Sequence, residues 1–171
     1  MLVYAKGIFL FLNVTKRDFM ITLKVGDKAP DFSAKDENGN TKSLSDYSGK
    51  KLVLYFYPKD MTPGCTAESC NLSENYEALL KSGFEVLGVS PDSEVRHQKF
   101  IAKYNFPFSL LADEEKEVIQ AFGVWGPKKF MGREYDGVHR TTFVIDENGI
   151  IEQIYTKVKT KDHYNQIMDS Y

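Results

Sequence analysis

Thiols and imidazoles are scarce in this chain of 171 residues. Its two cysteines, Cys65 and Cys70, are too few for the disulfide framework of a small secreted scaffold, and no second pair exists for a four-thiolate zinc site. The three histidines are His97, His139 and His163, and none stands at ligand spacing from the cysteines. We therefore expect no bound metal and no other cofactor.

The sequence also lacks a long apolar run and an excess of positive charge. Its most apolar stretch, GIFLFLNV at 7–14, is far shorter than the ~18–20 residues that cross a bilayer. Lys and Arg number 22 against 24 Asp and Glu, a net charge of −2 that gives no electrostatic footprint for nucleic acid or an anionic membrane. We expect neither as a partner. The composition, 42% hydrophobic and 27% charged, fits one globular domain.

The first nineteen residues stand apart from the rest. Lys6 and the apolar stretch after it faintly resemble a signal peptide, but the VTKRDFM that follows has no small-x-small cleavage site. Met20 begins MITLKVGDKAPDF, which is typical of a natural domain start. We interpret residues 1–19 as a non-catalytic extension, with a targeting segment as the alternative, and predict one domain over residues 20–171.

Strand-like and helix-like segments alternate from Gly26 onward, without a repeat or a linker. The apolar runs LVLYFY at 52–57 and FEVLGV at 84–89 predict strands buried on both faces of a covered sheet. The turn clusters DENGN at 36–40 and DENG at 146–149 predict two hairpins. Shorter strands are predicted at 109–111, 141–145 and 150–155.

Helices are predicted between these strands, where apolar residues recur at helical spacing and glycines such as Gly83 and Gly123 follow as stop signals. They cover 66–81, 93–104, 114–122 and 161–171. Strands and helices in this order predict an α/β fold with a mixed central β-sheet flanked by helices, in a thioredoxin-like arrangement.

Cys65 lies where the loop after strand 52–57 enters a helix, and open α/β sheets place their sites at the carboxyl ends of strands. A thiol in a first helical turn faces unpaired N–H groups and the positive end of the helix dipole, and both favour the thiolate. A small buried hydrophobe is the alternative for a lone cysteine. The spacing of Pro58, Thr62 and Glu68 around Cys65 argues for chemistry, because a core cysteine requires none of them.

The segment YFYPKDMTPGCTAESC at 55–70 resembles the active-site segment of peroxiredoxins, in particular the bacterioferritin-comigratory-protein class, also called peroxiredoxin Q. GDKAPDF at 26–32, FGVWG at 122–126 and YDGVHRTTFVID at 135–146 extend the resemblance from about Leu23 to the C-terminus. The proline–three–threonine–two–cysteine spacing is highly specific, and a second cysteine five residues later is the feature of this class.

The resemblance implies a role for each matched residue. Cys65 is the implied peroxidatic cysteine, whose thiolate attacks the O–O bond and becomes sulfenic acid. Thr62 supplies a hydroxyl that bonds the thiolate and the peroxide, and Pro58 shields the pocket. Arg140 holds the thiolate and the peroxide oxygens with its rigid fork of donors. Glu68 supports the loop and the arginine.

Cys70 is the implied resolving cysteine, which forms an intramolecular disulfide with Cys65 that thioredoxin or a similar dithiol reductant reduces. On one intact helix the two Cα atoms would be roughly 8–9 Å apart, whereas a disulfide needs about 4.4–6.8 Å. We therefore predict that residues 65–71 unwind in each cycle.

The resemblance implies a thioredoxin-dependent thiol peroxidase that reduces hydrogen peroxide and organic hydroperoxides. A thioredoxin-like disulfide oxidoreductase is one alternative, although its sites have Cys-x-x-Cys whereas this chain has four residues between its cysteines. A redox sensor that oxidises a protein partner shares the first step and stays open. We further expect a cytoplasmic monomer, with a dimer left open.

Three residues near the matched motifs invite a functional reading that we do not give them. His139 is interpreted as structural or solvated, because the peroxide reaction needs no such base. Trp125 and Phe130 are interpreted as packing residues rather than as a binding surface.

Overall fold

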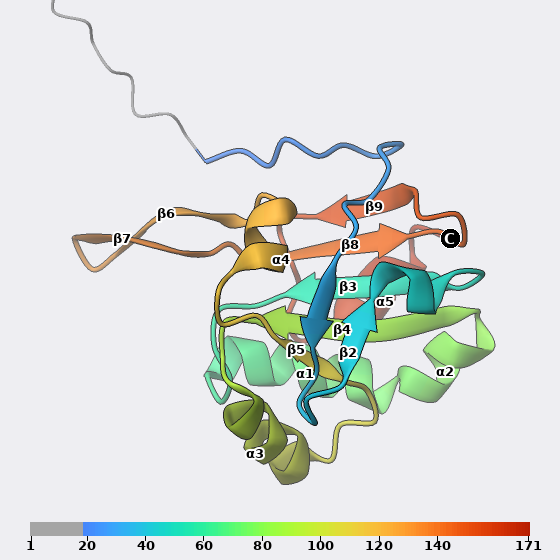
Figure 1. The fold of residues 1–171 in the computed structure, drawn as a ribbon, viewed down its shortest axis with the longest axis horizontal. Helices are drawn as coiled ribbons and strands as arrows, with labels where there is room; N and C mark the ends of the chain where they lie inside the picture. The colour runs from blue at the N-terminus through green and yellow to red at the C-terminus, as the bar shows by residue number, and fades with distance from the viewer. Residues whose placement is uncertain (1–18) are drawn as a thin grey trace, which may run out of the picture.

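The computed structural model of the protein describes residues 19–171, and its centre is a five-stranded mixed sheet in the order β5-β4-β3-β8-β9 (Figure 1). The strands are β3 (Lys51–Phe56), β4 (Phe84–Ser90), β5 (Leu110–Ala112), β8 (Thr141–Ile145) and β9 (Ile151–Tyr155). β3, β4 and β5 run parallel, whereas β8 runs antiparallel to both β3 and β9. The predicted mixed sheet is therefore confirmed, as is the hairpin formed by β8 and β9.

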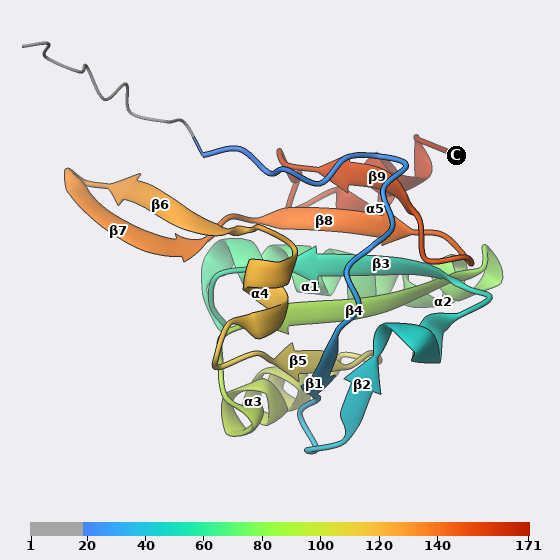
Figure 2. The same cartoon turned by 45° about the horizontal axis from the view of Figure 1, so that its top comes forward.

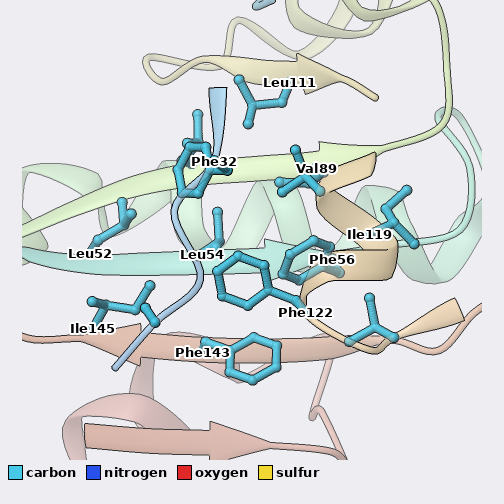
Figure 3. Packing of buried hydrophobic residues seen from close by; sticks show 14 of the residues in the cluster. Phe32, Leu52, Leu54, Phe56, Val89, Leu111, Ile119, Phe122, Phe143 and Ile145 are labelled. Atoms are coloured by element: carbon cyan, nitrogen blue, oxygen red, sulfur yellow. The ribbon is translucent and has the colours of Figure 1, made fainter. Parts of the chain in front are cut away.

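Strand β3 is central because its apolar side chains can be buried on both faces. Leu52 to Phe56 are at most 1% exposed. Leu52, Leu54 and Phe56 enter one core cluster, which Figure 3 shows packed around Phe122. The alternate side chains enter the second cluster, as the two-residue period of a strand requires.

Helices cover both faces of the sheet (Figure 2). The helices are α1 (Pro63–Glu74), α2 (Tyr76–Lys81), α3 (Glu94–Tyr104), α4 (Glu117–Ala121) and α5 (His163–Met168). α1, α2, α3 and α5 contribute to the core cluster that holds the thiol of Cys65, whereas α4 packs on the opposite face. Among residues 19–171, no helix has the length and apolarity that a membrane crossing needs.

Three predicted helices differ from the observed ones, and the last of them covers His163–Met168 rather than 161–171. The segment 66–81 is divided at Asn75, whose side-chain amide donates to the carbonyl of Asn71 at 2.8 Å and so competes with the helical ladder. Leu80, one of the apolar residues at helical spacing in this segment, is 44% exposed after this break. The third helix begins at Glu117 rather than 114, because Lys116 adopts a left-handed conformation with φ 59°.

A small hairpin confirms the prediction for DENGN. It consists of β1 (Ser33–Lys35) and β2 (Thr41–Ser43), followed by the 3₁₀ helix η1 (Leu44–Tyr47). Asp36 closes the turn by accepting from the N–H groups of Asn38 and Asn40.

A third hairpin was not predicted from the sequence. It is formed by β6 (Trp125–Phe130) and β7 (Arg133–Val138) and projects from the body of the molecule (Figures 1 and 2). Its sequence lacks the apolar alternation of a half-buried strand. Met131 and Gly132 form its two-residue turn with φ 49° and 80°, the left-handed pair of a type I′ hairpin. Phe130 lies beside this turn and is 65% exposed, so its interpretation as a packing residue was wrong.

Candidate active site

Cys65 occupies the first turn of α1, at the carboxyl end of β3. Pro63 is the first helical residue, and the first intrahelical bond runs from the N–H of Thr66 to the carbonyl of Thr62 at 2.9 Å. The N–H groups of Gly64 and Cys65 therefore precede the hydrogen-bond ladder. The side chain of Cys65 is 1% exposed and its thiol is free.

Arg140 brings a positive charge to this thiol from a distant part of the sequence. Its Nη2 donates to Cys65 Sγ at 3.3 Å, and its Nη1 donates to Glu68 Oε2 at 2.6 Å. Arg140 directly precedes β8, which pairs with β3, and β3 leads into the cysteine loop. The pairing of these two strands thus closes a separation of 75 residues.

Gly64 makes room for this arginine. A Cβ at position 64 would lie 3.1 Å from Arg140 Nη2, closer than side chains normally tolerate. A glycine at this position therefore permits the close approach of the guanidinium without displacing it.

Glu68 lies one turn after Cys65 and is fully buried. Burial raises the pKa of this carboxyl to about 7, against the opposing charge and hydrogen bond of Arg140. Burial also disfavours the charge of Arg140, but the negative charges of Glu68 and Cys65 outweigh it and raise the pKa of the guanidinium. Arg140 is thus shared between a carboxyl and a thiol.

Thr62 occupies the N-cap position but donates its hydroxyl hydrogen elsewhere. Thr62 Oγ1 donates to the carbonyl of Lys59 at 2.7 Å, and its side chain caps no helical N–H. The structure therefore does not show the implied bond from Thr62 to the thiolate. The hydroxyl oxygen can still accept a hydrogen bond from a peroxide O–H. Pro58 is half-buried in the same loop.

Cys70 lies on α1 with Cys65, in a half-exposed position. Burial and the nearby carboxylate of Glu74 raise the pKa of its thiol. Both cysteines are helical in the reduced protein, so the helical Cα separation of roughly 8–9 Å applies. A disulfide between them requires this part of α1 to change conformation.

Lys128 is a second cation that the sequence did not reveal. Burial and the charge of Arg140 lower the pKa of its ammonium, and the charge of Cys65 opposes them. Its Nζ donates to the carbonyl of Val138 across the β6–β7 hairpin at 2.9 Å. No sequence signal marked this lysine, because the hairpin that carries it was not predicted.

The loop before α1 is held by a buried network that the sequence also missed. Asp60 Oδ1 accepts from the hydroxyl of Tyr57 at 2.6 Å, and Oδ2 lies 2.7 Å from His97 Nδ1. The Asp60 N–H donates to Asp92 at 2.8 Å. Asp60 and His97 have fully buried side chains. They fix the loop that carries Pro58 and Thr62.

His139 lies beside Arg140 but outside this constellation. Its Nε2 contacts the carbonyl of Pro127 at 3.0 Å, and its ring stacks on Phe19 at a centroid distance of 3.7 Å. These contacts agree with a structural role. A cavity of about 530 Å³ opens beside Arg140, and Ile21, Ile154 and Lys128 are among its lining residues.

The candidate metal ligands of the described residues lie elsewhere. Within residues 19–171, Asp146, Glu147 and Glu152 form the one group of three such side chains. The group lies at the opposite end of β8 from Arg140. It includes neither cysteine.

The chain matches the model of the AhpC/TSA family over residues 25–154. It is 47% identical over 150 residues to Peroxiredoxin Bcp of Bacillus subtilis (strain 168), which covers 88% of this chain and 96% of that protein. The family match thus spans both cysteines, Arg140 and all of the central sheet except the last residue of β9.

Solved structures show the same fold. Peroxiredoxin Q of Xanthomonas campestris superposes with a TM-score of 0.78 at 33% identity, over 88% of this chain and 95% of that one. A structure of the bacterioferritin comigratory protein from the same organism, whose study addresses alkyl peroxide reduction, gives a TM-score of 0.78 at 32% identity, over 88% and 96% of the two chains. The predicted thioredoxin-like arrangement is confirmed by these neighbours.

Proposed function

Because the chain belongs to the AhpC/TSA family, in its Bcp or peroxiredoxin Q class, we propose that it is a thiol peroxidase that reduces hydrogen peroxide and organic hydroperoxides. The observation that carries the proposal is the 3.3 Å contact between Arg140 Nη2 and Cys65 Sγ at the start of α1. A guanidinium and a helix N-terminus together stabilise a thiolate, which is the nucleophile of this chemistry.

In the first step the Cys65 thiolate attacks one oxygen of the peroxide. An S–O bond forms, the O–O bond breaks, and the alkoxide or hydroxide leaves and takes up a proton. Arg140 and the N–H groups of Gly64 and Cys65 face the charge that moves from sulfur to oxygen. Thr62 accepts from the peroxide O–H, and Pro58 limits the entry of water.

In the second step the thiol of Cys70 attacks the sulfenic acid, releases water and leaves a Cys65–Cys70 disulfide. The first turns of α1 unwind to permit this bond. The contacts that anchor them are polar: Glu68 with Arg140, and Ser69 Oγ with the Tyr55 hydroxyl at 2.9 Å. Such contacts can be exchanged for water. A dithiol reductant such as thioredoxin then returns both cysteines to thiols.

The cavity beside Arg140 supports organic hydroperoxides as substrates. Its apolar lining includes Ile21, Leu23 and Ile154, and it reaches the guanidinium that contacts Cys65. An alkyl chain could occupy it while the O–O group approaches the sulfur.

We also propose that residues 20–171 suffice for activity, in a cytoplasmic monomer. Residues 1–18 of the proposed extension lie outside the described residues, whereas Phe19 stacks on His139. A chain that starts at Met20 should fold and turn over peroxide, and its comparison with one that starts at Phe19 measures the contribution of that ring. Equal sedimentation as a monomer at increasing concentration would support the oligomeric state.

The experiment that tests the function is peroxide consumption with thioredoxin and thioredoxin reductase. We expect turnover with hydrogen peroxide and with an alkyl hydroperoxide, and none for Cys65→Ser. Reduction of insulin disulfides without peroxide consumption would instead favour the disulfide oxidoreductase. Oxidation of Cys65 without turnover by any dithiol would favour the redox sensor.

A further inference from the structure

One buried oxygen of the site has no partner. Glu68 Oε2 accepts from Arg140, whereas Oε1 forms no hydrogen bond with any of the described residues. His163 Nε2 of α5 lies 3.8 Å from Oε1, too far for a bond. An unpaired carboxylate oxygen in the interior is costly, so its surroundings require an explanation.

The neighbours of Oε1 form a hydrogen-bond chain whose direction can be traced from its far end. Gln166 Oε1 accepts from the backbone N–H of Lys159 at 3.0 Å, and Gln166 Nε2 donates to the carbonyl of Lys157 at 2.9 Å. These two bonds fix the orientation of the amide. His163 Nδ1 lies 2.9 Å from Gln166 Oε1 and must therefore carry a hydrogen.

The direction continues toward Glu68. Burial lowers the pKa of His163 to about 4, so the ring is neutral and its Nε2 is an acceptor. Thr142 Oγ1, 2.8 Å away, must donate its one hydrogen to this nitrogen. Thr142 lies close to Glu68, where a hydroxyl hydrogen donated to the carboxylate would lower the pKa of Glu68. The bond to His163 commits that hydrogen elsewhere, so the Thr142 oxygen faces the carboxyl with its lone pairs. The lone pair of His163 Nε2 is taken up by this hydrogen, so the Thr142 oxygen is the neighbouring group that can still accept, and a hydrogen on Glu68 would complete the chain.

We propose that Thr142, His163 and Gln166 are positioning residues that hold Glu68 as a neutral carboxylic acid in the reduced enzyme, so that Arg140 directs its charge to the Cys65 thiolate. The inference rests on the proposed peroxidase function, and it identifies Glu68 as the group that stores a proton in this site. Glu68 still accepts from Arg140 through Oε2 when Oε1 is protonated. The guanidinium is therefore oriented by the carboxyl without being neutralised by it.

This arrangement keeps the charge of the site constant through the reaction. The reduced site holds a guanidinium cation and a thiolate anion beside a neutral acid. When peroxide oxidises the thiolate to neutral sulfenic acid, Arg140 faces no anion until Glu68 ionises. The alkoxide gains one proton and the carboxyl loses one, so the number of protons is conserved. The exchange proceeds through solvent, because Arg140 separates the two groups and an arginine keeps its proton.

The groups that face Glu68 come from four elements. Cys65 lies on the same helix, Arg140 precedes β8, His163 lies on α5, and the buried hydroxyl of Tyr55 reaches the neighbouring Ser69 from β3. Lys128 of β6 is one step further away, and its charge interacts with Arg140 and Cys65. Among these groups, Glu68 is the carboxyl whose pKa lies at about 7.

The test is an infrared difference spectrum of the full chain before and after one equivalent of hydrogen peroxide, recorded on the acid side of this pKa. We expect the C=O stretch of a protonated carboxylic acid in the reduced protein, its loss on oxidation, and its absence in Glu68→Gln. Mass spectrometry of the same samples reports Cys65 oxidation. If Cys65 is not oxidised, the peroxidase proposal fails; if it is oxidised without loss of an acid band, this inference fails.

Three further variants distinguish an effect of this hydrogen-bond chain from an effect of packing alone. Thr142→Val should remove the acceptor beside Oε1 and shift or weaken the acid band, with a changed pH profile of Cys65 oxidation. Thr142→Ser keeps the hydroxyl and should restore both. Tyr155→Phe, whose ring packs edge-on against His163 and whose hydroxyl bonds Ser170, perturbs α5 outside the chain and should leave the band in place. An unchanged band in Thr142→Val, or an equal loss in Tyr155→Phe, would overturn the proposal.

Discussion

Cys65 and Cys70 lie on one helix, five residues apart, in opposite environments. Cys65 is buried in the first turn, where Arg140 contacts its sulfur and Lys128 lies nearby. Cys70 is half-exposed about one and a half turns later, where burial and the nearby charge of Glu74 raise the pKa of its thiol. Because the residue type is the same, we expect this difference in surroundings to decide which thiol reacts with peroxide.

The largest effect on peroxide reduction should come from replacing the sulfur of each cysteine, one at a time, by oxygen. Cys65→Ser should abolish sulfenic acid formation, because it removes the one thiol held by a cation. Cys70→Ser should retain this oxidation but stop turnover, because the disulfide cannot form. Trapping with a sulfenic-acid reagent measures the first step and a coupled thioredoxin assay the second. Sulfenic acid in Cys65→Ser but not in Cys70→Ser would reverse the two roles.

Removal of Arg140 should make the environment of Cys65 resemble that of Cys70. Arg140→Ala should slow peroxide attack by about 10²–10³-fold, the usual cost of a lost preorganised donor. Arg140→Lys should restore the positive charge but not the planar set of N–H donors of the guanidinium, and should therefore recover only part of the rate. An unchanged rate of peroxide reaction in Arg140→Ala would remove the residue from the site.

The two ends of α1 should also differ in their response to oxidation. In the disulfide form, residues 65–71 should lose about 100-fold in amide protection, equivalent to about 2.7 kcal/mol of local opening. The last turn should stay protected, because Leu72 is fully buried. Hydrogen exchange of both redox states measures this, with the disulfide located by mass spectrometry. Equal protection in the two states would contradict unwinding, and a disulfide only between chains would contradict intramolecular resolution.

A smaller change should misplace Arg140 without removing it. Gly64→Ala places a methyl group 3.1 Å from Nη2, so the guanidinium must shift. We expect about a tenfold slower peroxide reaction, since displacements of less than 1 Å cost part of a ~10²-fold effect. Ala67→Gly, in the next turn of α1, is the control for altered helix propensity. Equal rates in Gly64→Ala and the wild type would show that the close approach is dispensable.

The smallest effect should come from the charge beside Cys70. Glu74→Gln removes a carboxylate that raises the pKa of this thiol, so the thiolate fraction below that pKa should increase. We expect about a twofold faster disulfide formation at neutral pH, because solvent screens an exposed charge. Glu77→Gln on α2 is the matched control. Stopped-flow fluorescence after a peroxide pulse measures the step, and an equal response in both variants would exclude a specific role for Glu74.

Much of the fold could be predicted because its signals are local. LVLYFY predicts a strand covered on both faces, and β3 is such a strand. The hairpin β6–β7 could not be predicted, because its stability depends on a left-handed turn at Met131 and Gly132 and on pairing within an exposed ribbon. The division of the first long helix at Asn75 likewise arises from a side-chain bond that competes with the ladder.

By itself the sequence determined the position of Cys65 at a strand–loop–helix junction, with Cys70 five residues later on the same helix. These features follow from residue spacing and short-range backbone preferences. Only the tertiary structure decided which charges surround each thiol. Arg140 and Glu68 are separated by 72 residues, and His163 belongs to the last helix. Their contacts exist because β3 pairs with β8 and α5 lies against α1, and burial then gives these few charges an influence that water would screen.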